Sequence, residues 1–369
     1  MFPHQDIKHH QSGFSLVEIM VGIGIGLVAS LVILQVFTVF EGQKRSATSG
    51  SDAETNGGIG LFSIERDVRM AGYGFSVPAA LGCVINSSYS GTSQPALSLT
   101  PVTITNGANG LPDTIKILYS SKGNWSVPAR ITVDHPPTAD NFFLNTTLGI
   151  AVDDLMIAFE PGKDCTLLQV TGIPNGNVQI HHQNTSPWDP PGGQNIFPAS
   201  GYGPGAMLFN LGALINRTYS LDAFSNLLLS DFSSPTNTSD EQSLTPNIVN
   251  LQAQYGFDTR VSPSDARVDT WSDAMIDADG SGVVGDSGDV ARIYAVRVAV
   301  VARSALLEKP KSDGTCDITT STSANKPTWS GGAIDVSKNP DGAANANWQC
   351  YRYKVFETVV PLRNLIWRE

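Results

Sequence analysis

A single carboxylate stands at the head of the longest apolar run in this 369-residue chain. Glu18 is followed by residues 19–40, which contain no Asp, Glu, Lys or Arg. As a helix, these 22 positions would extend about 33 Å, enough to cross a hydrocarbon core of about 30 Å. A carboxylate beside a membrane-spanning helix is costly and is usually kept for a function. We expect Glu18 to seek a cationic partner in such a low-dielectric setting.

A second group of oxygen ligands lies in residues 277–282 (DADGSG). The pattern begins like an EF-hand calcium loop, which has oxygen ligands at alternate positions and glycine at the sixth. The twelfth position should be a bidentate Glu, but Gly288 stands there, so a nearby acid would have to replace it. The candidate calcium ligands are Asp277, Asp279, Ser281, Asp286 and Asp289. A metal-free, Asp/Gly-rich hairpin turn is the alternative interpretation, and the sequence favours it.

Two further patterns contain catalytic residue types but do not support an enzyme. Residues 285–288 (GDSG) resemble the nucleophile loop of chymotrypsin-like proteases, but Asp289 follows where those proteases have Gly, and no histidine stands in a matching context. His181 and His182 are adjacent, and adjacent strand residues point to opposite faces, so we interpret them as a solvated loop pair rather than metal ligands. The sequence contains no Walker A loop, Rossmann fingerprint or zinc-protease helix. We therefore expect a non-enzyme without a cofactor, apart from the possible structural calcium.

Gly13 and Phe14 precede the apolar run, and Glu18 stands five residues after the glycine. This arrangement resembles the class III signal of type IV pilins and pseudopilins. The resemblance implies that prepilin peptidase cuts between Gly13 and Phe14, that Phe14 is N-methylated, and that Glu18 pairs with the Phe14 amine of a neighbouring subunit. Within the run, Gly22 and Gly26 have the GxxxG spacing that lets helices approach closely. The apolar core of a secretory signal is shorter, about 7–15 residues, which leaves an uncleaved single-span anchor as the alternative.

Later segments extend the resemblance to the PilW-like minor pilins. Residues 66–73 (RDVRMAGY) match a pattern, R-D-[LV]-R-x-A-G-[YF], that recurs at the end of the first helix in that family. Residues 251–258 and 293–304 look like its C-terminal strands, although the insert from Asp258 through Trp271 is longer than the family leads us to expect. Residues 80–245 match no family that we can name. The resemblance implies an α+β, type IV pilin-like fold, with a long N-terminal helix whose first half spans the membrane and an enlarged antiparallel β-rich head.

The composition limits the classes of partner. The chain has 34 Asp and Glu against 23 Lys and Arg, a formal net charge of −11. Such an acidic chain is a poor candidate for neutralising nucleic-acid phosphates, or for lying on anionic lipid through a polybasic patch. The 35 Gly and 22 Pro, with only 15% charged residues, suit a loop-rich extracytoplasmic β protein.

Four cysteines are present, and none forms a C-x-x-C pair, so zinc and thioredoxin-type sites lack support. An even number in an exported chain favours disulfides, and three connectivities are possible. We favour Cys83–Cys165 and Cys316–Cys350, because each would join residues of one lobe. The second pair encloses a polar segment with little to bury, where loop closure helps most. It also resembles the C-terminal disulfide loop of many pilins.

The chain divides into five expected regions. They are a leader (1–13), a transmembrane and filament-core helix (14–40), the amphipathic second half of that helix (41–75), the first part of the head (76–245) and a C-terminal β-sheet region with a disulfide loop (246–369). The second half of the helix is rich in glycine, which costs up to ~1 kcal/mol per residue relative to Ala. Residues 46–51 are therefore a candidate for fraying, and a plain linker between anchor and head is the alternative interpretation. The residues whose three- to four-residue spacing predicts packing on a sheet are Ile59, Phe62, Ile64 and Val68.

Strands are predicted wherever short β-rich runs are bounded by Gly, Pro, Asn or Ser. They cover residues 96–105, 114–119, 129–133, 154–159, 166–172, 201–219, 247–258, 289–303 and 348–361. Residues 353–361 alternate well and are expected to pair with residues 292–301. Loops are predicted at residues 184–203 and 230–243.

These features together predict a non-catalytic minor pilin that primes pilus assembly. It would sit in the inner membrane as a single-pass protein with a periplasmic head, and then join type IV pili at the cell surface, at or near the tip. The implied partners are prepilin peptidase, the inner-membrane assembly platform, the other minor pilins and the major pilin, with no nucleic acid. Two alternatives stay open: a large pseudopilin of a type II secretion system, and a tip adhesin or ligand-binding module.

Overall fold

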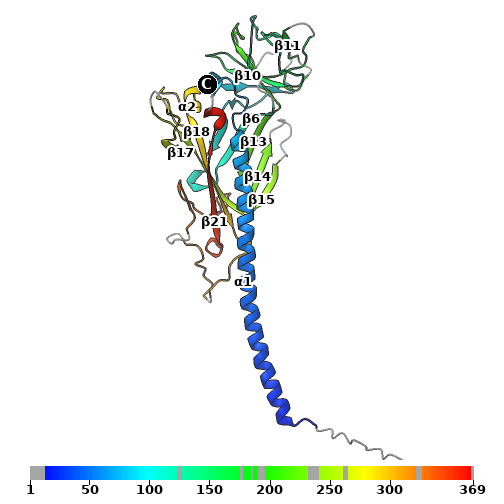
Figure 1. Cartoon of the computed structure of the whole chain (residues 1–369), viewed down its shortest axis with the longest axis vertical. Helices are drawn as coiled ribbons and strands as arrows, with labels where there is room; N and C mark the ends of the chain where they lie inside the picture. Colours follow the sequence, from blue (N-terminus) through cyan, green and yellow to red (C-terminus); the bar gives the residue numbers. More distant parts are fainter. Residues whose placement is uncertain are drawn as a thin grey trace, which may run out of the picture.

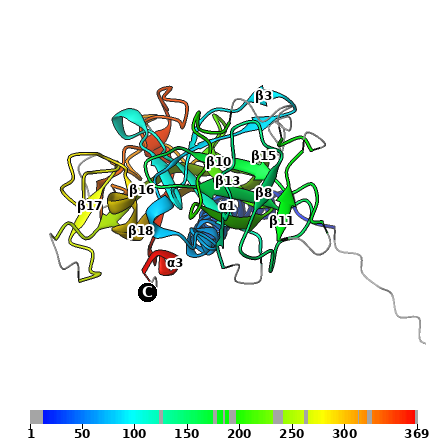
Figure 2. The same ribbon diagram turned by 90° about the horizontal axis from the view of Figure 1, so that it is seen from above.

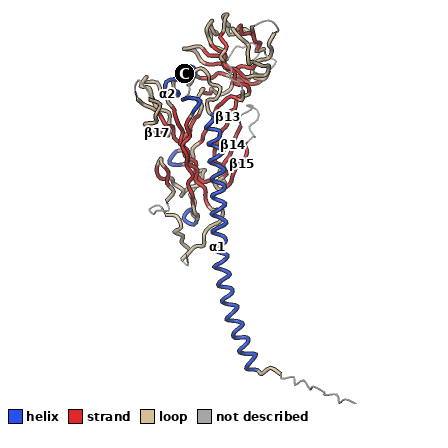
Figure 3. The backbone as a smooth tube through the Cα atoms, in the orientation of Figure 1, coloured by secondary structure: helices blue, strands red, loops and turns tan. Residues whose placement is uncertain are grey.

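The computed structural model describes residues 13–122, 127–174, 178–183, 186–189, 196–231, 241–260, 265–311, 313–320 and 326–366. The remainder of the predicted leader, residues 1–12, lies outside this part. One long helix, α1 (Leu16–Met70), leads into a β-rich head (Figure 1). Its first half stands clear of the head, and its second half lies against the strands (Figure 3). The predicted α+β, pilin-like arrangement is confirmed.

Helix α1 runs without a break for 55 residues. Ser15 caps its N-terminus, with the side-chain Oγ accepting a hydrogen bond from the Glu18 N–H at 3.2 Å. The interpretation that residues 46–51 fray is wrong, because the helix continues through this stretch. Ser49 is the first described side chain of α1 to be buried, and its Oγ accepts a hydrogen bond from the Leu306 N–H at 3.1 Å. Contact with the head therefore supports the helix where its glycine content is unfavourable.

Two glycines let α1 approach the head closely. An added Cβ at Gly57 would lie 2.2 Å from the Phe356 ring, and one at Gly60 would lie 3.1 Å from Leu227 Cδ2. An added Cβ at Gly58, between them, would meet nothing within 4 Å. The glycines that weaken α1 as an isolated helix therefore create the surface along which it packs.

The buried face of α1 agrees only in part with the prediction. Ile64 and Val68 are fully buried, as expected. Ile59 and Phe62, by contrast, are 47% and 65% exposed. The spacing alone was misleading because small residues, rather than large apolar side chains, occupy the inner face in the preceding turns.

The head consists of short and long strands joined by irregular segments. The strands of the three larger sheets are β1 (Val84–Asn86), β4 (Leu97–Ser98), β5 (Val102–Thr105), β6 (Thr114–Ser120), β7 (Ala129–Arg130), β9 (Leu155–Phe159), β10 (Cys165–Gln169), β12 (Met207–Gly212), β13 (Leu214–Leu221), β14 (Asn226–Asp231), β15 (Glu241–Pro246), β16 (Ile248–Phe257), β17 (Thr270–Ser272), β18 (Ile293–Arg303) and β21 (Tyr353–Pro361). Three ribbons pair β2 (Ser88–Tyr89) with β3 (Thr92–Ser93), β8 (Asn141–Phe143) with β11 (Gln179–His181), and β19 (Thr328–Trp329) with β20 (Gly332–Ala333). The short helices are α2 (Ser287–Ala291), α3 (Arg363–Ile366), and the 3-10 turns η1 (Pro78–Ala80), η2 (Ala108–Gly110) and η4 (Trp348–Cys350).

The larger sheets have the orders β4-β1-β10-β9-β12-β7, β15-β14-β13-β6-β5 and β17-β16-β18-β21. Among the described strands, only β1 and β10 pair in parallel. Viewed from above, α1 lies between the sheet that contains β16 and β18 and the strands on the side of β13 and β15 (Figure 2). The head therefore encloses the second half of α1 from two sides.

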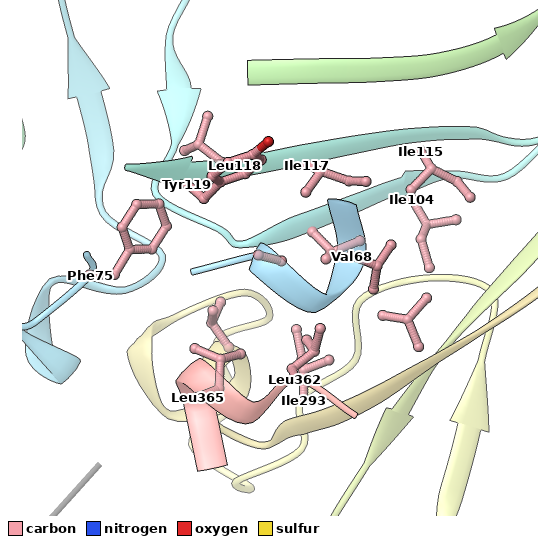
Figure 4. Packing of buried hydrophobic residues seen from close by; sticks show 14 of the residues in the cluster. Val68, Phe75, Ile104, Ile115, Ile117, Leu118, Tyr119, Ile293, Leu362 and Leu365 are labelled. Atoms are coloured by element: carbon pink, nitrogen blue, oxygen red, sulfur yellow. The ribbon is translucent and has the colours of Figure 1, made fainter. Parts of the chain in front are cut away.

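Three hydrophobic clusters are buried in the described part of the head, and the smallest consists of Val249, Val301, Ile334 and Val336. The largest cluster joins side chains from Ala53 to Leu365, and Figure 4 shows Val68 of α1 among Ile117, Ile293 and other residues of the surrounding strands. The second cluster lies within residues 129–208, which we call the apical lobe, at the end of the head far from the N-terminus of α1 (Figure 1). The largest cluster takes side chains from both sides of residue 245. The boundary that we predicted in the head, between residues 76–245 and 246–369, stays a prediction.

The strand predicted at residues 247–258 is confirmed as β16, and so is the pairing of β21 with β18, in which Ala295 lies opposite Pro361. Residues 201–219 instead contain β12 and the start of β13, and residues 348–350 form η4. The strand predicted at residues 289–303 instead begins with α2, because Asp286 caps that helix by accepting hydrogen bonds from two of its N–H groups. The loop predicted at residues 230–243 is partly wrong, since its ends belong to β14 and β15, while residues 232–240 lie outside the described part.

Replacing Gly57 by alanine should destabilise the protein, whereas Gly58→Ala should not. The methyl group of an alanine at position 57 would force the Phe356 ring or the helix to move, and such overpacking costs about 1–3 kcal/mol. At Gly58 the methyl group meets nothing and improves helix propensity by up to ~1 kcal/mol. Chemical denaturation of the full chain in detergent measures both free energies of unfolding, and equal values for the two variants would contradict the close contact.

Candidate functional site

The Gly13–Phe14 bond lies just outside α1. Residues 13–15 are not helical, and α1 begins at Leu16. Phe14 is 81% exposed. An exposed, non-helical segment is the kind of chain that a peptidase can engage. The predicted cleavage after Gly13 and methylation of Phe14 stay predictions, and the local geometry suits both.

The first half of α1 presents its apolar side chains outward. The helix is long and apolar enough to cross a membrane, and none of its most apolar 18-residue stretch is buried. Glu18 lies in the first turn, where a carboxylate interacts favourably with the N-terminal N–H groups of a helix. Gly22 and Gly26 lie one turn apart, and an added Cβ at either would meet nothing within 4 Å. This face is therefore open to lipid or to another helix.

Inside the head, Asp67 of the RDVRMAGY segment fastens α1 to β13. Its side chain is 2% exposed and accepts hydrogen bonds from Arg217 Nη1 at 3.0 and 3.1 Å and from Tyr219 Oη at 2.6 Å. We call these three residues the Asp67 clamp. Arg217 also donates to Asp231 of β14 at 3.1 Å. Burial, followed by the hydrogen bond to Asp67, raises the pKa of Tyr219, so its hydroxyl remains a donor at neutral pH.

Sequence reasoning missed the partners of Asp67. Arg217 stands 150 positions later in the chain, and nothing in its local sequence connects it to α1. Arg217 lies on β13, which pairs with β6, and β6 is hydrogen-bonded to the turn that follows α1. The sequence shows Asp67 within the RDVRMAGY segment, but it does not show that Asp67 joins α1 to β13.

Two glycines after the clamp turn the chain from α1 into the head. Gly72 and Gly74 have φ angles of +73° and +85°, which L side chains rarely adopt. An added Cβ at Gly74 would also lie 2.3 Å from Ser120 Cβ. The turn is fixed to β6 because the Gly72 N–H donates to the Leu118 carbonyl at 2.9 Å and the Ser120 N–H donates to the Tyr73 carbonyl at 2.8 Å. The acid and the glycines of this segment thus serve the junction between helix and head.

The structure brings three of the five candidate calcium ligands together. They are Asp277, Asp279 and Asp289, whose ligand atoms all lie within 4.8 Å of one another. Asp286 instead caps α2, and Ser281 Oγ donates a hydrogen bond to it at 2.9 Å. Such a set of carboxylates matches the hard oxygen donors that calcium prefers.

The same loop also satisfies its carboxylates internally. Asp289 is fully buried and accepts a hydrogen bond from the Gly285 N–H at 2.7 Å. Asp277 accepts two more from loop glycines, both at 2.9 Å. An added Cβ at Gly288 would lie 1.8 Å from Asp279 Oδ2, so a ligand residue at this position would have to displace the Asp279 side chain. Both the turn and the calcium loop fit this geometry, so calcium binding stays a prediction for calorimetric titration of the folded chain.

Both predicted disulfides are confirmed. Cys83–Cys165 joins the segment before β1 to the first residue of β10, across a sequence separation of 82. Cys316–Cys350 has a separation of 34 and closes the loop between β18 and β21. Each bond favours the folded head by restricting the conformations of the unfolded chain.

The interpretation of His181 and His182 as a solvated pair is wrong for His182. His182 is 4% exposed, and its Nε2 lies 2.9 Å from Nε2 of His135, which is itself 1% exposed. The His135 ring stacks on Phe142, with ring centroids 3.7 Å apart. Burial lowers the pKa of His135 to about 4, and burial together with the neighbouring imidazole lowers the pKa of His182 to about 3. Both rings are therefore neutral at pH 7, and one donates its N–H to the other.

Two family models match the chain. Residues 8–34 match the prokaryotic N-terminal methylation motif, and residues 215–364 match the type IV pilus-assembly protein W (PilW) family. No curated protein matches the chain. The first match covers Gly13, Phe14 and Glu18, and the second covers β16, β18 and β21, so the resemblance to PilW-like prepilin-type minor pilins is confirmed. The second match begins inside the region that we could not assign, and it includes Arg217 of the clamp.

Asp67→Asn should loosen the junction between α1 and the head. Removing one partner of a buried ion pair costs about 3–5 kcal/mol, and we expect about 3 kcal/mol because Arg217 is 23% exposed. Glu65→Gln is the matched control, since its partner Arg69 is 52% exposed and surface pairs contribute about 0–1 kcal/mol. Thermal unfolding of the full chain compares the two, and an equally small change in both would show that the clamp does not hold the helix.

The two buried histidines should make the apical lobe less stable in acid. Their folded pKa values lie below the ordinary value of 6.5, so the unfolded lobe binds more protons as pH falls. Their stabilising contribution is complete above pH 6.5 and is lost as pH falls toward 4 and 3. Asp189 of the same lobe, whose pKa burial raises to about 7, contributes with the opposite sign.

A comparison of variants isolates the histidine contribution. His182→Phe keeps an aromatic ring in the lobe but removes one titrating group. The protection of the β8 and β11 amides against hydrogen exchange, taken relative to the unfolded-chain rate at each pH, should therefore vary less between pH 7 and pH 4 than in the wild type. His181→Gln, at the neighbouring and less buried position, keeps both buried imidazoles and should therefore retain most of the pH dependence. An unaltered pH dependence in His182→Phe would contradict the assignment.

Proposed function

We propose that this PilW-like chain is a minor pilin that is anchored in the inner membrane by a single pass of α1, with its head in the periplasm, before it enters a type IV pilus. The observation that carries the proposal is one unbroken helix with an outward-facing apolar half and a half packed inside the head. An apolar half-helix of this kind can be surrounded by lipid or can pack against other helices. The two family matches support membership of the pilus.

Processing of the leader supplies the cation that Glu18 would pair with. Cleavage by prepilin peptidase after Gly13 would create an α-amine on Phe14, and this amine can carry a positive charge after N-methylation. In the low-dielectric core of a filament, attraction between Glu18 and the Phe14 amine of a neighbour is far stronger than in water. An uncleaved subunit lacks that amine, so processing and assembly are coupled.

Other residues of the chain would pack the helix against its neighbours and fix the orientation of the head relative to the helix. Gly22 and Gly26 offer a face for close helix packing, and the Asp67 clamp joins the same helix to the head. The head would then set the order of subunits among the other minor pilins and the major pilin, delivered by the inner-membrane assembly platform. In this account the chain primes assembly at or near the tip, and its role is structural rather than catalytic.

The apical lobe favours a second candidate function, a ligand-binding or adhesive module. The lobe has its own hydrophobic core and lies outside the residues that match the PilW family. It also lies at the end of the head opposite the apolar half of α1 (Figure 1). In a subunit at the filament tip, that end would face the surroundings.

Glu18→Ala should be processed normally but excluded from pili. The substitution leaves Gly13 and Phe14 in place for the peptidase, yet it removes the carboxylate that would pair with a neighbour's amine. Glu41→Ala, which removes the next acid along α1 beyond the apolar run, is the control and should enter pili at the wild-type level. Immunoblots of sheared fibres and of membranes, in a strain that lacks the wild-type gene, measure both.

The same strain separates the proposal from its alternatives. Glu18→Ala in fibres at the wild-type level would contradict the charge-pairing mechanism. A deletion strain that keeps its pili but loses type II secretion would show a pseudopilin instead.

A further inference from the structure

The loop between β18 and β21 lies at the end of the head nearest the apolar half of α1. In Figure 1 this orange loop reaches farther toward the N-terminal end of α1 than any other part of the head. The loop is fixed to α1 by the hydrogen bond from the Leu306 N–H to Ser49 Oγ, and it is closed by Cys316–Cys350. Leu306 and Leu307, where it leaves the helix, are 46% and 41% exposed.

The loop is long enough to reach a membrane surface. Ser49 lies nine residues beyond Phe40, the end of the apolar run, or about 13 Å along the helix axis. Lipid headgroups fill about 5–8 Å of that distance. Lys311 lies five residues beyond Leu306, and an extended chain of that length covers up to ~16 Å. The turn in which the Lys311 N–H donates to the Thr315 carbonyl at 2.9 Å is therefore within reach of the headgroups.

The charges of this turn suit a zwitterionic surface. Lys309 is exposed, and Lys311 pairs with Asp317 at 2.5 Å at the surface. Asp313 accepts hydrogen bonds from the Thr315 N–H at 2.9 Å and from its hydroxyl at 2.7 Å. The two ammonium groups are thus balanced by two carboxylates, without a large net charge. Contact with phosphate and amine headgroups needs no polybasic patch, in agreement with the acidic composition of the chain.

We propose that Leu307, Lys309, Lys311 and Asp313 dock on the phospholipid headgroups of the membrane that α1 spans. The lysines contact lipid phosphates, and Leu307 lies at the outer boundary of the headgroup layer. The contact holds the head at a defined tilt beside its anchor, and it is lost when the subunit leaves the membrane for the filament. The inference rests on the membrane span of the proposed function.

The test uses the full chain in phospholipid vesicles, with single introduced cysteines that carry an environment-sensitive fluorophore. The four native cysteines are paired in disulfides, so each label has one site. Pro310→Cys places the label between the two lysines, and Leu148→Cys places it in the apical lobe at a residue that is 83% exposed. Lipids with a nitroxide at headgroup depth should quench most of the fluorescence at position 310 and none at position 148.

A third label separates failure of the docking from failure of the span. Phe37→Cys lies in the apolar run and should be quenched by lipids with a nitroxide on the acyl chain. Quenching at position 37 without quenching at position 310 would overturn the docking and leave the span intact. Absence of quenching at position 37 would overturn the span and the docking together. A label at position 310 that becomes shielded only when other pilins are added would show a protein contact and would also overturn the docking.

Discussion

One helix has to satisfy two environments, and the rest of the structure follows from that constraint. The first half of α1 exposes apolar side chains on all sides, whereas the second half is enclosed by the sheets of the head. The helix is continuous between them, so whatever holds the first half also positions the head. In the function that we propose, lipid would surround the first half before assembly, and neighbouring helices would surround it within a filament. The same surface therefore suits both states, and Glu18 distinguishes them because its proposed partner exists only among processed subunits.

The junction between helix and head explains residues that otherwise look unfavourable. Gly57 and Gly60 lower the intrinsic stability of α1, yet their lack of a Cβ lets Phe356 and Leu227 approach. Asp67 is a buried acid, yet Arg217 neutralises its charge and Tyr219 donates a hydrogen bond to it. A helix fastened by both devices cannot rotate or slide freely against the sheets. The head is then carried in a fixed orientation by the packing of the N-terminal half.

Local features of the chain were predictable from sequence, and long-range ones were not. The apolar run, the strands β16, β18 and β21, and the disulfides have signals in periodicity, composition or cysteine number. The clamp was not predictable, because Arg217 lies on β13, far from Asp67 in the sequence. His182 was misjudged for the same reason, since its partner His135 comes from a segment 47 residues away. Ile59 and Phe62 have the spacing of a buried face, but the side of α1 that packs on the head is the side that carries Gly57 and Gly60.

The central claim is that the N-terminal helix is processed and then moves from the membrane into the filament. The mass of the N-terminal peptide, taken separately from sheared surface fibres and from membranes, tests it most directly. We predict a peptide that begins at N-methylated Phe14 in both fractions. The same peptide confined to membranes would point to an assembly factor or a secretion pseudopilin. An intact start at Met1 in both fractions would contradict the account and leave only a single-span anchored protein.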